Sequence, residues 1–199
     1  MLKENEIRDF RSSSPKKLAF IFPPYGVIDN EPGLKVVKEN YGVFPSLSLL
    51  YVAGSAEGAG HDCLFIDLNA NPEPIESTIE TLKKFQPDYI LYTLTTYQFK
   101  ENLDFARNLK EAYPCPVLVG GVHMGIYAEE SMSHDVFDVG FIGEIEISLP
   151  MFLERDVMDL DGFGEVPGII FKRDGRYRRT RPAPQLQNVD NAHFPARHL

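Results

Sequence analysis

Short apolar runs alternate with amphipathic stripes along most of this chain, and the alternation restricts the fold more than any other feature. A continuous apolar run bounded by turn residues is typical of a strand buried on both faces. Such runs occur at 18–22, 63–66, 89–94, 117–119 and within 136–142. Because helical stripes separate most of them, the strands pair in parallel through right-handed crossovers. The sequence therefore predicts an α/β fold, a doubly wound five-stranded parallel sheet of flavodoxin-like or Rossmann-like type with strand order 2-1-3-4-5.

The expected helices are recognised by apolar residues that repeat every three or four positions. Residues 75–85 and 99–113 show this stripe most clearly. A further helix over 46–58 begins at Ser46, a favourable N-cap residue. Its expected inner face consists of Leu47, Leu50, Tyr51 and Gly54. The last helix begins at 145, and a proline at position 150 is expected to bend or shorten it.

The chain divides into a central domain and three smaller parts. Residues 17–155 contain the βα units and form the expected binding domain. Residues 1–16 are polar and are expected to be a flexible leader. Residues 156–184 are expected to form a β-hairpin appendage, because two strand-like runs flank an Asp-Gly pair at 174–175. The proline-containing residues 185–199 are expected to be a linker.

The net charge of −9 on 199 residues disfavours nucleic acid as a partner, because like charges repel. A basic cluster at the edge of the expected hairpin is the exception, and we assign it no site. It consists of Arg176, Arg178, Arg179 and Arg181. No apolar run approaches the roughly 20 residues needed to cross a bilayer, and the leader lacks the apolar centre of a secretion signal. We therefore expect a cytoplasmic protein without a nucleic-acid or membrane partner.

The two cysteines of the chain, Cys63 and Cys115, are each surrounded by apolar strand residues. Neither has a second cysteine at the short spacing that zinc and iron–sulfur sites require. The sequence therefore predicts two buried, reduced thiols and no metal site.

The fourth apolar run leads directly into Gly120 and Gly121. In an open parallel sheet, ligands bind beyond the carboxyl ends of the strands. Glycine at such an end lets a ligand approach the backbone and adopts positive φ without strain. We therefore expect a large ligand over this pair, bordered by the loops after strands one, three, four and five. These loops span 23–30, 93–98, 120–127 and 143–146.

The loop residues exclude two ligand classes that are common on this fold. A phosphoacceptor receiver needs an acidic cluster after strand one and an aspartate after strand three, but these positions hold prolines (23–24) and threonines (95–96). A dinucleotide site needs GxGxxG directly after strand one, where this chain reads FPPYG. What remains is a roomy, mostly neutral pocket that suits a large, neutral, amide-rich ligand.

Several segments together resemble the cobalamin-binding domains at the N-terminus of class B radical S-adenosylmethionine enzymes. In order, they are FPPYG, FPSLSLLYVAGSAEGAGHDC, TLTTYQF, VGGVHMG, FIGEIE, PGIIFKRDG and NVDNAHFPAR, and they cover nearly all of residues 17–197. The resemblance implies that cobalamin lies over the carboxyl edge of the sheet. Its nucleotide tail would lie between strands one and three, beneath the ends of strands three and four. No catalytic residue and no protein metal ligand follow from the resemblance for this chain.

The residues that the resemblance assigns to cobalamin come from all four loops. They are Pro24, Tyr25, Gly26, Thr93, Thr95, Thr96, Tyr97, Gly120, Gly121, His123, Gly143 and Glu144. His123 is expected in a loop, where it hydrogen-bonds a corrin amide, and Glu144 belongs to the family's GE signature at a helix N-terminus. Cobalamin domains that ligate cobalt carry DxHxxG after strand one, whereas this chain has no histidine there. The expected binding mode is base-off and His-off, with Tyr25, Gly26 or a water near the lower face.

The chain departs from the family in two places. The family has a small residue between the glutamates of GExE, whereas Ile145 is bulky and Pro150 interrupts the next turn. The family also continues into a radical S-adenosylmethionine barrel with CxxxCxxC, which holds S-adenosylmethionine and a [4Fe-4S] cluster, and no residue here can hold that cluster. The resemblance therefore implies the cofactor-carrying part of a methyltransferase or cyclase, which works with a catalytic domain in cis or in trans.

Three other interpretations stay open from the sequence. A stand-alone cobalamin carrier or sensor would pass its ligand or signal to a separate partner. An interaction module would keep the fold without the ligand. A different adenosyl or flavin ligand would use the same edge of the sheet. Fold alone does not choose among them, whereas the absorption spectrum of the bound ligand does.

Overall fold

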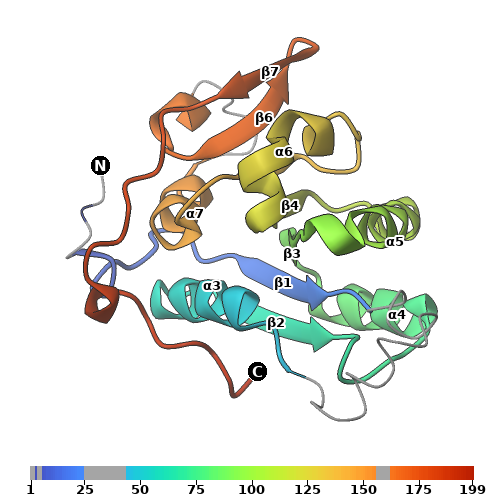
Figure 1. Ribbon diagram of the computed structural model, residues 1–199. Helices are drawn as coiled ribbons and strands as arrows, with labels where there is room; N and C mark the ends of the chain where they lie inside the picture. Colours follow the sequence, from blue (N-terminus) through green and yellow to red (C-terminus); the bar gives the residue numbers. More distant parts are fainter. Residues whose placement is uncertain (1–2, 4–5, 25–43, 156–161) are drawn as a thin grey trace.

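Seven strands form one continuous sheet in the described part of the computed structural model, which comprises residues 3, 6–24, 44–155 and 162–199. The strands are β1 (Lys17–Phe22), β2 (Asp62–Asp67), β3 (Tyr89–Thr93), β4 (Val117–Gly120), β5 (Val139–Phe141), β6 (Ile169–Arg173) and β7 (Arg176–Arg179). Their order is β2-β1-β3-β4-β5-β6-β7, and the first five pair in parallel (Figure 1). This confirms the predicted order 2-1-3-4-5.

Two layers of helices cover the sheet (Figure 1). One layer contains α3 (Leu47–Gly58) and α7 (Ile145–Leu153), and the other contains α4 (Ile75–Phe85), α5 (Phe99–Ala112) and α6 (Val122–Met132). Because side chains alternate along a strand, neighbouring residues of β3 enter different layers. Leu91 packs in the α3/α7 layer, whereas Tyr92 packs edge-on against Phe105 of α5. Within the described residues, no helix is long and apolar enough to cross a membrane.

Helices α4 and α5 confirm the predicted stripes, whereas only Leu50 and Gly54 of the predicted inner face of α3 are buried. Leu47 and Tyr51 are exposed, at 44% and 39% of their surface. The buried residues of α3 are Leu49, Leu50, Val52, Ala53, Gly54, Ser55 and Ala56. Because α3 is buried on most of its sides, its apolar residues do not form a single stripe in the sequence. Helix α7 continues through Pro150 to Leu153, so the proline does not shorten it at that point.

Helix α6 lies where the sequence pattern indicates a loop. Its exposed residues include Val122 and Ile126, at 68% and 67% of their surface. Its buried residues are His123, Met124, Ala128, Ser131 and Met132. Large apolar side chains therefore lie on the outer side and two polar ones on the inner side, which hides the helical stripe in the sequence.

The β-hairpin is part of the main sheet and does not stand apart from it. Strand β6 pairs antiparallel with β5, with Val139 opposite Phe171. Asp174 and Gly175 connect β6 to β7 with φ values of 51° and 72°, the positive φ that an Asp-Gly turn favours. Ile169 and Phe171 are buried in the α3/α7 layer, while Ile170 is buried in the other. Because both core layers continue across β6, the hairpin closes the edge of the domain.

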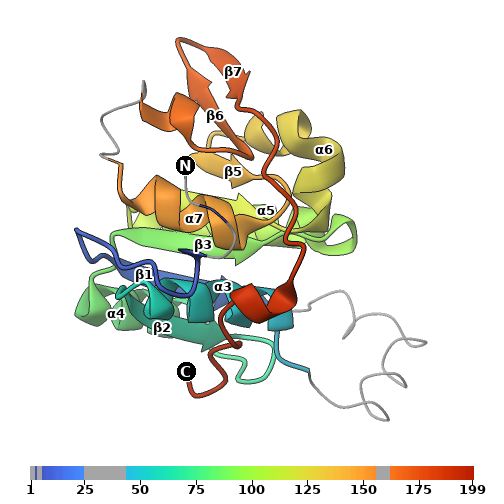
Figure 2. The same ribbon diagram turned by 90° about the vertical axis from the view of Figure 1, so that its left-hand side faces the viewer.

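Both terminal segments pack on the domain over their described residues. In the expected leader, Ile7 is buried, and the amide of Ser12 donates to the Ala59 carbonyl at 2.7 Å. In the expected linker, the amide of Ala196 donates to the Leu50 carbonyl at 3.0 Å, and η4 (Val189–Asn191) lies near α3 (Figure 2). A Cβ atom at Gly54 would overlap the backbone of this segment. The small residue in α3 therefore makes room for the C-terminal segment.

Candidate functional site

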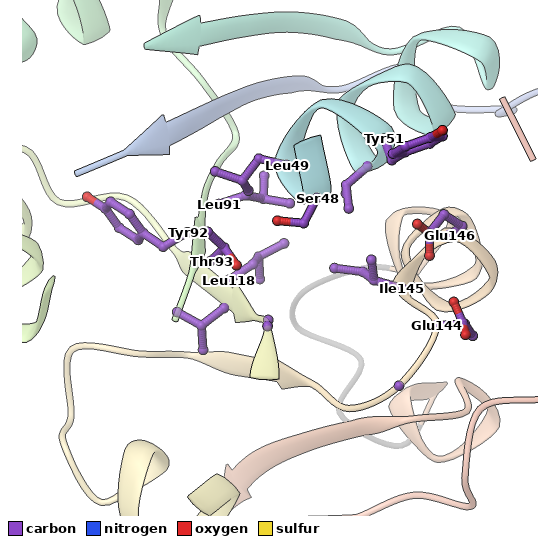
Figure 3. Close-up of a pocket in the computed structure, with 15 residues that line it drawn as sticks. Ser48, Leu49, Tyr51, Leu91, Tyr92, Thr93, Leu118, Glu144, Ile145 and Glu146 are labelled. Carbon is purple, nitrogen blue, oxygen red and sulfur yellow. The ribbon is translucent and has the colours of Figure 1, made fainter. Parts of the chain in front are cut away.

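A cavity of about 210 Å³ opens at the carboxyl ends of β3 and β4, between α3 and α7 (Figure 3). Gly120 and Gly121 line it, so it lies at the predicted edge of the sheet. The side chains that form its walls include Ser48, Leu49, Leu91, Thr93, Leu118 and Ile145. Figure 3 shows those of α3 and the strands on one side and Ile145 on α7 across from them.

The two glycines have different physical roles. Gly121 has φ 101°, and a Cβ atom there would lie 2.7 Å from the Leu94 carbonyl oxygen and 2.7 Å from Thr93 Oγ1. The local backbone therefore requires glycine at 121. At Gly120, a Cβ atom would meet only ordinary contacts, the nearest being Ile145 Cδ1 at 3.6 Å. The fold accepts a small side chain at 120, and the bare backbone there leaves the cavity open.

The inner part of the cavity is apolar and its mouth is polar. Leu49, Leu91 and Leu118 are at most 4% exposed and belong to the core of the α3/α7 layer. The hydroxyl groups of Ser48 and Thr93 are nearer to solvent, since Ser48 is exposed and Thr93 is half-buried. Such a space suits a flat apolar group that carries one polar atom near the opening.

Five of the predicted ligand residues line this cavity. They are Thr93, Gly120, Gly121, Gly143 and Glu144. Five others lie outside its lining: Pro24, Thr95, Thr96, Tyr97 and His123. Pro24 is exposed just after β1, and Thr96 and Tyr97 are exposed in the short helix η2 (Thr96–Gln98), which follows β3. Tyr25 and Gly26 lie outside the described residues.

His123 is not a loop residue, because it lies in the first turn of α6 and is 3% exposed. Its ring stacks on Phe99 at 4.2 Å between centroids, and its Nδ1 lies 3.1 Å from Thr96 Oγ1. Burial lowers the pKa of His123, and the charge of Glu130 opposes this shift. These contacts belong to the layer of α4, α5 and α6, so His123 and the cavity are on opposite faces of the sheet.

Two carboxyl groups border the cavity at the start of α7. Glu144 is the N-cap residue, and Glu146 lies in the first turn, where a negative charge is favoured by the helix dipole. Burial raises the pKa of Glu146, and the neighbouring charge of Glu144 raises it further. Gly143 precedes them with φ 91°, a conformation that favours glycine. This wall of the cavity is therefore acidic, in contrast to the apolar wall under α3.

Several lining residues were not among the predicted ligand residues: Leu49, Leu91 and Leu118, and also Glu146, although Glu146 lies in the predicted bordering loop 143–146. Two of them follow from the strand period, because Leu91 and Leu118 precede Thr93 and Gly120 by two positions and share their face of the sheet. Leu49 carries no such signal, since α3 has no clear apolar stripe.

The described residues contain no group of three or more His, Cys, Asp and Glu side chains that is placed to hold a metal ion. Cys63 and Cys115 are free thiols, half-buried and buried respectively. Burial raises the pKa of Cys63, and it raises that of Cys115 to about 12. Both thiols are therefore protonated at neutral pH and unreactive.

Residues 33–153, more than half of the chain, match the family model described as B12 binding domain. Among curated proteins, the chain is 29% identical over 188 residues to an uncharacterized methyltransferase of Pyrococcus horikoshii. It is 25% identical over 179 residues to the anaerobic magnesium-protoporphyrin IX monomethyl ester cyclase of Synechocystis. These alignments cover 90% and 87% of this chain but only 38% and 34% of the relatives' own lengths.

Two solved structures show the same fold at lower sequence identity. The cobalamin-dependent S-adenosylmethionine radical enzyme OxsB, with aqua-cobalamin bound, matches with a TM-score of 0.67 and 17% identity. The radical S-adenosylmethionine methyltransferase TsrM from Kitasatospora setae, with cobalamin and a [4Fe-4S] cluster bound, matches with a TM-score of 0.65 and 16% identity. Each match covers 92% of this chain, and 24% and 31% of those chains respectively.

Proposed function

The chain belongs to the family of B12 binding domains, and from that premise we propose that it binds cobalamin at the carboxyl edge of its sheet. The nucleotide base of the cofactor enters the cavity between α3 and α7. The single observation that carries this proposal is the apolar cavity beside the backbone of Gly120. When bound, cobalamin supplies a redox-active cobalt that can carry a methyl group, and the protein supplies binding and orientation.

The size of the cavity supports entry of the base alone. Sites that take up a whole drug-sized ligand have volumes of about 300–1,000 Å³, and this cavity has about 210 Å³. An apolar cavity of about 150 Å³ is enough to bind benzene. The space therefore fits a fused bicyclic base, and the corrin ring must lie outside, above the strand ends. Thr95, Thr96 and Tyr97 follow β3 at this end of the sheet and are the proposed contacts of the corrin ring.

The positions of the histidines support base-off, His-off binding. None of the five histidines of the chain lines the cavity, and His123 is held on the opposite face of the sheet. Once the base lies in the cavity, it is also unavailable to the cobalt. We therefore propose that neither the base nor an imidazole of this chain coordinates the cobalt. The lower face is left to residues 25–26 or to water.

The proposed partner is a radical S-adenosylmethionine catalytic domain, in cis or in trans. The relatives with this fold are much longer than the chain, and OxsB and TsrM are radical S-adenosylmethionine enzymes. S-adenosylmethionine and the [4Fe-4S] cluster belong to that domain in this proposal. The two curated relatives, a methyltransferase and a cyclase, point to two reaction types for the assembled enzyme.

Corrin retention tests the proposal directly. The purified chain is mixed with hydroxocobalamin, desalted and measured by absorption, and the one-electron reduced form is measured by electron paramagnetic resonance. We expect one corrin per chain and a cobalt signal without nitrogen splitting. Loss of all corrin on desalting contradicts the proposed function, and nitrogen splitting contradicts the axial-ligand part of it.

Two glycine-to-leucine substitutions, one in the cavity and one away from it, provide the matched variants for this test. Gly120→Leu fills the cavity with a side chain and is expected to weaken corrin binding by about a hundredfold, equivalent to roughly 2.8 kcal/mol. Gly164→Leu adds the same side chain at a position where a Cβ atom meets nothing within 4 Å. The control is expected to bind corrin like the unchanged chain. Equal binding by both variants would place the base elsewhere.

A further inference from the structure

We infer that the cavity selects corrinoids by the chemistry of their lower base and favours a benzimidazole over a purine. This inference rests on the proposed function, because it concerns the same cavity and the same class of ligand. It goes further by naming the part of the ligand that determines the affinity and the side chains that contact this part. The lining and the backbone bonding of the cavity carry the argument.

The inner walls offer only hydrocarbon contacts. Leu49, Val52, Leu91 and Leu118 are each at most 6% exposed and form one apolar layer under α3. Ile145 closes the opposite side from α7 (Figure 3). A ring with methyl substituents keeps dispersion contacts with such walls and loses no hydrogen bond on entering.

Part of the backbone at the end of the cavity is already hydrogen-bonded within the sheet. Thr93 of β3 is opposite Gly120 of β4 in the parallel ladder, and the amide of Leu94 donates to the Gly120 carbonyl at 2.8 Å. Among the described lining residues, only Tyr92 has a buried side-chain polar atom without a partner. Its ring packs against Phe105 in the other layer, and Figure 3 shows it pointing away from the cavity.

The hydroxyl groups near the mouth can satisfy the one polar atom that a benzimidazole presents. A benzimidazole joined to its sugar through one nitrogen keeps a single free ring nitrogen, which accepts one hydrogen bond. The hydroxyl of Ser48 or Thr93 can donate that bond. An adenine has further ring nitrogens and an amino group, and those that face the leucine side chains of the inner wall would have no partners there. Each polar group that is buried without a partner loses its hydrogen bonds to water, and this loss weakens binding. The corrinoid with a purine base is therefore expected to bind more weakly.

A comparison of three corrinoids tests the inference on the unchanged chain. Equilibrium dialysis, read by corrin absorption, gives dissociation constants for hydroxocobalamin, for its analogue with adenine as lower base, and for cobinamide, which lacks the lower nucleotide. We expect hydroxocobalamin to bind about tenfold or more tightly than the adenine analogue. Cobinamide is expected to bind more weakly than hydroxocobalamin as well, because it leaves the cavity unfilled.

The possible outcomes separate this inference from the proposed function. If hydroxocobalamin and the adenine analogue bind equally well, base selection is wrong while cobalamin binding stands. If cobinamide binds as tightly as hydroxocobalamin, the base contributes nothing and the inference is again overturned. If no corrinoid binds, the proposed function fails and this inference fails with it.

A pair of leucine variants assigns the selection to the cavity wall. Leu49→Gln puts an amide on the wall and is expected to narrow the ratio of the two dissociation constants by about threefold or more. Leu103→Gln makes the same change at a residue of α5 that is 6% exposed and lies in the other layer. It is expected to leave the ratio unchanged. A ratio that is unchanged in both variants, with both folded by circular dichroism, contradicts the role of the wall.

Discussion

The two faces of the sheet share the same strand ends but use them differently. On the α3/α7 face, Thr93 and Gly120 border an open cavity. On the other face, the helix that follows β4 begins immediately after Gly121, and its second residue, His123, stacks on Phe99. The space at the strand ends is therefore filled on one face and open on the other. In a doubly wound sheet, the direction of each strand-end residue decides whether it can reach a ligand, even when the loops converge.

The two adjacent glycines provide the largest expected contrast in stability. Gly121→Ala is expected to lower the free energy of unfolding by about 2–4 kcal/mol, because the residue has positive φ and its Cβ would overlap the end of β3. Gly120→Ala is expected to change it by less than about 1 kcal/mol, since the new Cβ meets only ordinary contacts. Urea denaturation followed by circular dichroism measures both. Equal losses would show that the backbone at 121 is not strained by a side chain.

His123→Phe tests whether the face of the sheet that α4, α5 and α6 cover takes part in cobalamin binding. The variant keeps the ring stack on Phe99 and removes the bond to Thr96, so we expect the cobalamin dissociation constant to change by less than about threefold. A much larger loss of affinity, in a variant that unfolds at the same urea concentration as the unchanged chain, would show that the imidazole contacts the ligand directly.

The same variant is also expected to change how the stability of the protein depends on pH. Burial lowers the pKa of His123 in the folded state, so the unfolded chain takes up a proton there first as the pH falls. The stability that depends on a neutral His123 is present above its usual pKa of about 6.5 and is lost as the pH falls through the lower folded value. Between pH 7.5 and 5.5, the unchanged chain should lose more stability than His123→Phe. Urea midpoints at the two pH values provide the measurement, and parallel losses would contradict it.

The acidic wall at α7 gives the smallest expected effect. Burial raises the pKa of Glu146, so its charged form is disfavoured in the folded state at neutral pH. Glu146→Gln is therefore expected to be slightly more stable than the unchanged chain at pH 7. The difference should disappear as the pH falls below the usual carboxyl pKa of about 4.3, where the group is neutral in both states. Thermal melting of both proteins at pH 7 and pH 4 measures this, and a variant that is less stable at pH 7 contradicts it.

The sequence predicted the sheet well because the signals for its strands are local. The apolar runs that end at Phe22, Thr93 and Gly120 can be recognised as buried strands from their own residues alone. Helix α6 was not predicted, because its buried side includes His123 and Ser131 while Val122 and Ile126 are exposed. Half of the predicted ligand residues with described positions line the cavity. The other predicted residues lie in the same loops, but the sequence does not show which way their side chains point.

The sequence by itself determined the parallel sheet, its order and the glycine pair at its edge, since strand period and backbone freedom are properties of a few neighbouring residues. Only the tertiary structure decided which face holds the cavity, because that depends on how close α3, α6 and α7 approach the sheet. It also decided that the C-terminal segment packs on α3, where glycine at 54 makes room for it. Those distances are set by packing between segments far apart in the chain, which no local pattern contains.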